Sequence, residues 1–172
     1  MKEQTIYSYK LIYRFRWRGL GFLLQGLTLF VLLGMFSVTT DFPLNKLLVS
    51  LSVVVIIPVA QFALFRLFAY TQSHTVRPSL NQFVSAWWGT STPLPVSLRF
   101  FRGVEATVCA GSLLIAATLY VWLPYACGVA LLAGTIVLIL PRVLVLLISL
   151  RQPKHCSVKY EARSISFLLT DG

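Results

Sequence analysis

Four long apolar segments, with nearly all basic residues on one side of them, constrain this chain more than any other feature of its sequence. The segments cover residues 19–38, 47–65, 104–123 and 126–150. A helix needs roughly 20 apolar residues to cross a hydrocarbon core about 30 Å thick, and each segment is about that long. Because backbone polar groups in lipid must be satisfied within the segment itself, the sequence predicts four transmembrane helices.

The distribution of lysine and arginine predicts how these helices are oriented. Five basic residues precede the first segment, one follows it, four lie between the second and third, none lies between the third and fourth, and four follow the fourth. Cytoplasmic loops carry an excess of Lys and Arg, so both termini are expected in the cytoplasm. The expected fold class is all-α: a polytopic membrane protein with four transmembrane helices and both termini cytoplasmic. A bacterial inner membrane fits this pattern best.

A length of 172 residues is typical of a single domain, and the same pattern divides the chain into three parts. Residues 1–18 are basic and aromatic and are expected at the membrane interface, where a helix would place Lys10, Arg14 and Arg18 on one stripe. Residues 19–150 form the four-helix domain, which includes a cytoplasmic loop at residues 69–101. Residues 151–172 form a cytoplasmic tail.

Composition excludes several classes of protein. The charged fraction is 12%, whereas soluble domains carry about 25%. A net charge of +10 could suggest nucleic acid, but basic loops that set orientation and meet lipid headgroups explain it better. No disulfide is expected: Cys109 and Cys127 fall at different depths, beyond the roughly 7 Å that a disulfide allows, and Cys156 lies in the reducing cytoplasm.

Four polar side chains interrupt the apolar segments, and ionisable residues at such positions are functional candidates by default. They are Gln25, Gln61, Glu105 and Arg142. Two interpretations of the arginine stay open. Its side chain could snorkel to the cytoplasmic interface, or it could pair with the glutamate, which starts the third segment at about the same depth.

Helix packing has its own signals. Ala126, Ala130 and Gly134 recur at every fourth position of the fourth segment, and small residues at this spacing allow close helix approach. The neighbour could be the third segment or another chain. Pro58 lies inside the second segment and is expected to kink it.

No motif in the sequence indicates catalysis, a cofactor or a metal. The acidic residues are scattered over different parts of the chain, and neither the cysteines nor the two histidines have metal-ligand spacing. The residues that remain as candidates form a predicted cytoplasmic face for protein partners: Arg14, Arg16, Arg18, Trp87, Trp88, Arg99 and Arg102. Topology anchoring by the arginines and an aromatic belt formed by the tryptophans are the competing interpretations.

Two functions therefore stay open. The first is a non-catalytic accessory, structural or sensor subunit of a larger membrane assembly, homo- or hetero-oligomeric, which binds membrane lipids and cytoplasmic protein partners but not nucleic acid. The second is a small oligomeric translocator of a lipid-linked or amphiphilic substrate. A sealed, Leu-packed bundle would favour the first, and a polar, water-accessible groove at Gln25, Gln61 and Glu105 would favour the second.

One family resemblance points toward the second function. Four short spans with both ends inside, and Gln61, Phe62 and Arg66 closing the second span, resemble the GtrA-like membrane proteins. The resemblance covers residues 14–151 and implies a link to lipid-carried sugars. This chain departs from that family's pattern in the polar positions of the first span and in the Asn-rich close of the second.

Overall fold

The computed structural model describes residues 9–72, 87, 92, 94–153, 155–161 and 164–170, and it is mostly helical, at 73%. Four of its helical segments are long and apolar enough to cross a membrane, as judged by length and composition. They are α1 (Gly19–Thr40), a second segment built from α2 (Leu44–Ser50), η1 (Leu51–Val55) and α3 (Ile56–Thr71), then α5 (Leu98–Trp122) and α6 (Tyr125–Leu150). The prediction of four such helices is confirmed.

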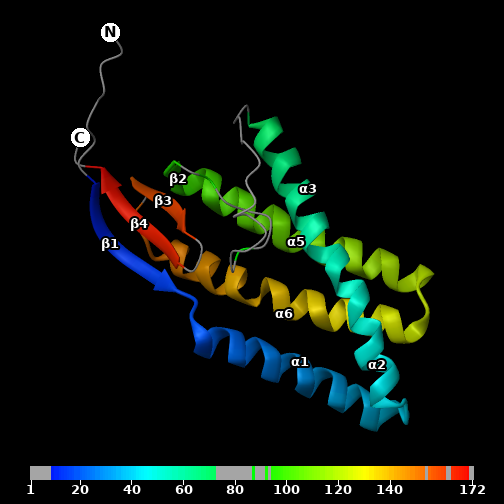
Figure 1. The fold of residues 1–172 in the computed structure, drawn as a ribbon. Coiled ribbons are helices and arrows are strands. Elements are labelled where there is room, and N and C mark those ends of the chain that lie inside the picture. The colour runs from blue at the N-terminus through cyan, green and yellow to red at the C-terminus, as the bar shows by residue number, and fades with distance from the viewer. Residues whose placement is uncertain are drawn as a thin grey trace.

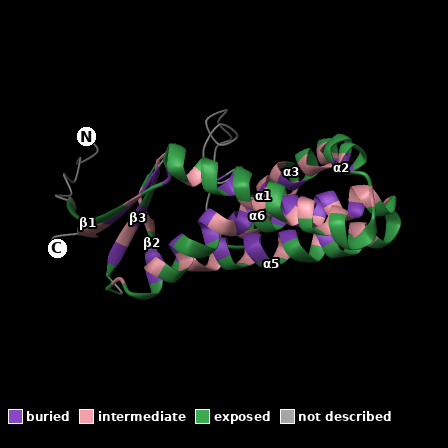
Figure 2. Cartoon of the chain, turned by 90° about the horizontal axis from the view of Figure 1, so that it is seen from below, coloured by how far each residue is buried: buried purple, intermediate pink, exposed green. Residues whose placement is uncertain are grey.

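The helix α6 lies at the centre of this bundle (Figure 1). It packs against α1, α2, η1 and α5, while α3 packs against α5. Half of its most apolar stretch is buried, compared with 11% for α1, so α6 supplies the core and α1 lies at the periphery. In Figure 2 the buried residues concentrate along α6, whereas exposed residues cover the outer faces of the other helices.

The helix changes geometry just before Pro58, the residue at which a kink was expected. The segment η1 is a tightened 3-10 helix, and it ends three residues before the proline. Proline cannot donate to the carbonyl four residues earlier, and its ring crowds that carbonyl, which disfavours regular α geometry in the preceding turn. The same region packs closely on α6, because a Cβ added to Gly134 would lie 2.6 Å from a Val54 methyl carbon.

A four-stranded antiparallel sheet is the part of the fold that the all-α prediction lacks. Its strands are β1 (Tyr9–Arg16), β2 (Val96–Ser97), β3 (Cys156–Glu161) and β4 (Ser164–Thr170), in the order β1-β4-β3-β2. Residues 9–16 are therefore a strand and not the interfacial helix that was expected, and the C-terminal tail is mostly sheet. Both ends of the described chain meet in this sheet, since β1 pairs with β4 along most of its length.

Alternation of side chains explains why these segments form strands. In β1 the rings of Tyr13 and Phe15 alternate with Arg14 and Arg16, and successive side chains of a strand point to opposite faces. A helix would have spread these rings around its circumference. The sheet instead gathers the apolar set on one face and the arginines on the other.

The apolar face of the sheet caps one end of the helical bundle, where α1 and α5 begin and α3 and α6 end (Figure 1). The core between sheet and helices contains Trp17, Trp87, Leu98, Phe101, Val145, Cys156, Val158, Tyr160, Ile165 and Phe167. Phe101 meets Phe167 edge to face at 6.1 Å between ring centroids. Burying each large side chain of this kind contributes about 1.5–3 kcal/mol, so the cap is firmly attached. We call these strands and the core beneath them the sheet cap.

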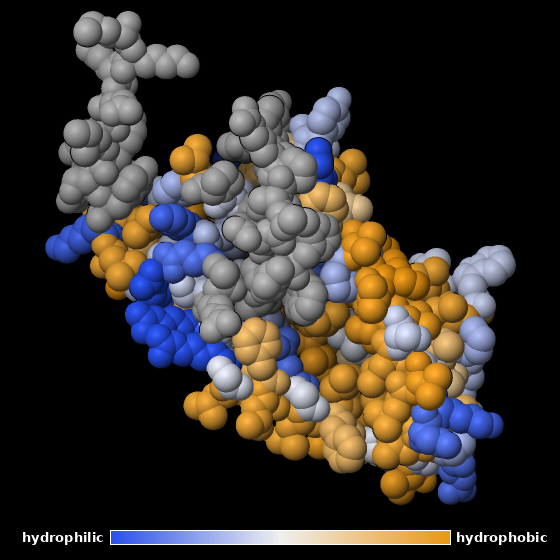
Figure 3. All heavy atoms as spheres, viewed as in Figure 1, coloured by the Kyte–Doolittle hydropathy of each residue, from blue (hydrophilic) through white to orange (hydrophobic). Residues whose placement is uncertain are grey.

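The surface divides along the same line. Figure 3 shows hydrophobic side chains over much of the helical surface, whereas hydrophilic side chains gather over the sheet and, in a smaller group, at the opposite end of the helices. Large apolar side chains on the helices are strongly exposed, among them Leu20, Phe30, Val38, Val49, Val121 and Trp122. An exposed apolar surface of this extent marks contact with a partner or with lipid.

Candidate functional site

A buried ion pair stands at the junction of the bundle and the sheet cap. Arg142 on α6 donates from Nη1 to Oε2 of Glu105 on α5, at 3.0 Å. The two side chains are 1% and 0% exposed. The structure thus decides between the two interpretations of Arg142: its guanidinium pairs with the glutamate and does not reach solvent.

Three further groups among the described residues join this cluster. Nη2 of Arg142 donates to Oε1 of Gln61 on α3, at 3.3 Å, and to the backbone carbonyl of Trp87. Tyr160 on β3 donates from its hydroxyl to Oε1 of Glu105, at 2.8 Å. Burial, followed by the charge of Glu105, raises the pKa of Tyr160 well above its ordinary value, so the phenol keeps the proton that it donates. The cluster ties three helices to the sheet.

Both carboxylate oxygens of Glu105 are engaged, and that limits what the cluster can do chemically. One accepts from Arg142 and the other from Tyr160. A general base must lie within hydrogen-bond reach of the proton that it takes, and Glu105 is 0% exposed. This arrangement instead acts as a lock, because removal of one partner would leave the other charge buried and uncompensated.

A second buried connection joins α1 to α6 through Gln25. Its Nε2 donates to the backbone carbonyl of Val137 at 3.0 Å, and its Oε1 accepts from Nε1 of Trp17 at 3.1 Å. Val137 lies four residues before Pro141, which has no N–H and so leaves that carbonyl without its helical partner. Gln25 satisfies this carbonyl of Val137 and links it to Trp17, which directly follows β1.

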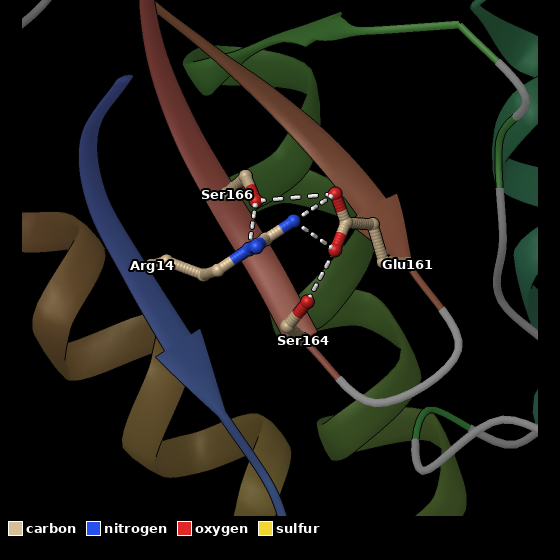
Figure 4. A network of polar contacts seen from close by, with 4 residues as sticks. All are labelled: Arg14, Glu161, Ser164 and Ser166. Atoms are coloured by element: carbon tan, nitrogen blue, oxygen red, sulfur yellow. Dashed lines mark hydrogen bonds and ion pairs between the residues drawn. The ribbon is translucent and has the colours of Figure 1, made fainter.

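The outward face of the sheet carries a third network, drawn in Figure 4. Arg14 reaches from β1 across β4 and donates from Nη2 to both carboxylate oxygens of Glu161 on β3, at 2.7 and 2.8 Å. Ser164 also donates to that carboxylate, and Ser166 accepts from Nε of Arg14 at 3.2 Å. The hydrogen bond from Ser164, and then the guanidinium of Arg14, hold the pKa of Glu161 below its ordinary value.

Two open pockets border β1. One, of about 700 Å³, lies where the outward face of the sheet meets the start of α1, and its lining includes Arg14, Arg16 and Arg18. The other, of about 640 Å³, lies between Tyr13 and Phe15 of β1 and the last turns of α6, and it is mostly apolar. We call them the arginine pocket and the apolar groove.

The predicted partner-binding residues separate into different environments. Trp87 is fully buried in the core of the sheet cap, so its assignment to a contact surface is corrected: the ring completes that core. Trp88 lies outside the described residues. Arg99 is exposed. Arg102 is occupied, because it donates to both the side chain and the backbone carbonyl of Ser149 at the end of α6.

The small-residue stripe of α6 faces its own chain. Ala130 and Gly134 are buried, and Ala126 is half-buried. At Gly134 the neighbour is Val54 of η1, so the second helical segment approaches there and not a separate chain. The three cysteines are free.

Sequence reasoning missed the residues that the sheet brings to these sites. Trp17, Tyr160, Glu161 and Ser164 were not singled out, because the segments that carry them were expected to be an interfacial helix and a tail. Alternation was the available signal: apolar and polar residues alternate through residues 157–161 and 164–167. Such runs are short, and the hydropathy of the four long segments dominates any scan of this chain.

Comparisons with known proteins give no further identification. No family model matches the chain, and neither the curated proteins nor the solved structures provide a match. The resemblance to GtrA-like proteins therefore stays an expectation from the sequence. Within the described residues there is also no group of three His, Cys, Asp or Glu side chains that could hold a metal ion.

Proposed function

We propose that this protein is a non-catalytic, four-span membrane protein whose sheet cap lies on the cytoplasmic side and docks a protein partner of a larger membrane assembly. Its apolar helices and exposed apolar side chains suit a lipid environment. The sheet cap lies at the end where Lys and Arg gather, which supports a cytoplasmic position for both termini. A bacterial inner membrane is the location that this arrangement suits best.

The observation that carries the proposal is the contrast between a sealed bundle and an open sheet edge. Gln61 and Glu105 are 0% exposed and Gln25 is 8% exposed, so the polar residues that a translocation groove would need are closed off. Within the described residues β1 pairs with β4 alone. Its residues Leu11, Ile12 and Tyr13 are between 42% and 52% exposed. An open, partly apolar edge of this kind is a site for strand addition.

The chemistry around the edge specifies the partner segment. A strand added beside β1 would point alternate side chains toward the apolar groove, where Leu147 and Leu150 are exposed. Lys10 on β1 and Arg151 at the end of α6 are exposed and basic, and the one described acid on the outside of the sheet cap, Glu161, is already paired with Arg14. The partner is therefore an extended segment in which apolar residues alternate with acidic ones.

A matched pair of variants tests this docking site. Leu150→Glu places a negative charge in the apolar groove, while Val121→Glu places the same charge on another exposed apolar residue, near the opposite end of the bundle. We expect a partner that co-purifies in mild detergent to be lost with Leu150→Glu and retained with Val121→Glu. Equal recovery with both variants would contradict docking at this edge.

Orientation has its own test. Lys159 on the sheet cap and Asn45 at the start of α2 are both exposed, at opposite ends of the helices. A cysteine at position 45 should react with an impermeant thiol reagent applied outside intact cells, and a cysteine at position 159 should react only after the membrane is opened. The reverse pattern would contradict the proposed topology.

A further inference from the structure

The arginine pocket has a basic lining that the docking edge does not use. Arg14 and Arg16 occupy alternate positions of β1 opposite Ser166 and Ser164, and so they lie on the outward face of the sheet. Arg18 is the N-cap residue of α1, directly before Gly19. Three arginines and the single Glu161 leave the lining with a net charge of +2.

Two of these arginines have side chains without a partner among the described residues. Arg14 is held by Glu161 in an ion pair. The side chains of Arg16 and Arg18 make neither a hydrogen bond nor an ion pair in the part of the chain that the structure describes. Guanidinium groups offer paired donors that match the oxygens of a phosphate, so this pair is free to bind one.

The start of α1 adds backbone donors to the same pocket. No side chain caps this 22-residue helix, and no acidic residue lies in its first turn. The N–H groups of Gly21 and Phe22 bond to the carbonyl of Arg18, which leaves those of Gly19 and Leu20 for an external acceptor. A side chain at Gly19 would meet no atom within 4 Å, so a ligand has room to approach that backbone. Helix N-termini favour anions.

One wall of the pocket is apolar. Phe22, in the first turn of α1, lines it and is 44% exposed. Beyond it the exposed face of α1 continues with Leu23, Leu27 and Phe30. A ligand with a charged head in the pocket and an apolar chain along α1 would satisfy both surfaces.

We propose that the arginine pocket binds a phosphate group, with Arg16 and Arg18 as its side-chain ligands, presented by the headgroup of an anionic phospholipid. The site does not depend on the docking partner. Its access to a lipid headgroup depends on the proposed membrane topology, because only a membrane-inserted α1 brings acyl chains beside Phe22. Soluble phosphate shares the same head chemistry and is distinguished by experiment.

Lipid binding by the purified full-length protein tests the proposal. Native mass spectrometry in mild detergent would compare dioleoyl phosphatidylglycerol with dioleoyl phosphatidylcholine, and calorimetry would measure inorganic phosphate. We expect preferential binding of phosphatidylglycerol that falls about tenfold or more for each of Arg16→Gln and Arg18→Gln, and about 100-fold for the double variant. Arg99→Gln, at an exposed arginine outside the pocket, should bind as wild type does.

Each outcome decides the question. Wild-type binding by the double variant would overturn the site. Equal affinity for phosphatidylglycerol and inorganic phosphate would overturn the lipid as the source of the phosphate group while leaving a phosphate site. If the double variant loses binding of an acidic peptide but keeps binding of the lipid, the arginines belong to protein docking. Should the double variant not fold, the two single variants carry the comparison. Failure of Leu150→Glu to release a partner would affect the docking proposal alone.

Discussion

Removing the carboxylate of Glu105 should weaken the attachment of the sheet cap, so that the cap detaches from the bundle more often. In Glu105→Leu the guanidinium of Arg142 stays buried with two neutral acceptors, Gln61 and the carbonyl of Trp87, and the hydroxyl of Tyr160 loses its acceptor. Removing one partner of a buried ion pair typically lowers the free energy of unfolding by about 3–5 kcal/mol, and we expect a loss of that size here. For a chain of this length that corresponds to a fall in Tm of roughly 6–20 °C.

Cys156 reports this detachment directly. It is 2% exposed inside the core of the sheet cap, and burial raises the pKa of its thiol, so it should react slowly with thiol reagents while the cap is closed. In a background of Cys109→Ala and Cys127→Ser, Glu105→Leu should speed labelling of Cys156 and lower Tm together.

Two controls separate a buried charge from other effects. The double variant Glu105→Leu with Arg142→Met removes both charges and should recover most of the loss, since apolar side chains of similar size replace buried pairs well. Glu161→Gln breaks the partly exposed pair with Arg14 and should cost about 1 kcal/mol or less. Unchanged Tm and unchanged Cys156 labelling in Glu105→Leu would refute the lock.

Other parts of the structure make separate predictions. Gln25→Leu leaves the buried carbonyl of Val137 without a hydrogen-bond donor and should lower the free energy of unfolding by about 1–3 kcal/mol, measured by thermal unfolding. Gly134→Val, which collides with Val54, should cost about 1–3 kcal/mol, whereas Gly26→Val meets no neighbour and should not destabilise. Because the pKa of Glu161 is lowered in the folded protein, its ionised carboxylate contributes to stability at every pH above the ordinary pKa of 4.5. That stability is lost as the pH falls through the lowered pKa of the folded state. Glu161→Gln should therefore flatten the acid side of a Tm-against-pH curve.

The number of long helices was accessible from sequence because it depends mainly on hydropathy, whereas their ends were less so. The first segment was expected at residues 19–38, and α1 spans Gly19–Thr40. The third was expected to begin at residue 104, yet α5 begins at Leu98, where Ser97 accepts a hydrogen bond from the backbone N–H of Phe100. The first turn of α5 lies under the sheet, and a hydropathy scan excludes it because Arg99 and Arg102 lower its average.

The sheet depended on pairing between the two ends of the chain, which local patterns do not reveal. Arg14 and Glu161 are 147 residues apart and meet only because β1 pairs with β4. Read locally, residues 9–16 fit a basic interfacial helix as well as a strand. Their alternation favours a strand only when a second strand and an apolar surface are available to cover one face.

Only part of the candidate site could be predicted from the sequence, for the same reason. Glu105 and Arg142 share a depth in the third and fourth segments, so spacing made their pairing one of two interpretations, and the structure was needed to exclude snorkelling. The contact from Tyr160 required the sheet, and the contact between Gln25 and Val137 required knowledge that α1 packs beside the turn of α6 that Pro141 leaves open. Those two contacts explain why polar residues inside apolar helices serve packing here.

Site-specific cross-linking from the open edge of β1 tests whether a protein partner docks at the sheet cap. A photoreactive residue at Ile12, 42% exposed on that edge, and another at Val38, 80% exposed near the opposite end of α1, would be activated in intact membranes. We expect a protein adduct from position 12 alone, joined to an extended segment in which apolar residues alternate with acidic ones. Adducts to lipid only at position 12, or the same protein adduct from both positions, would contradict docking at the sheet cap.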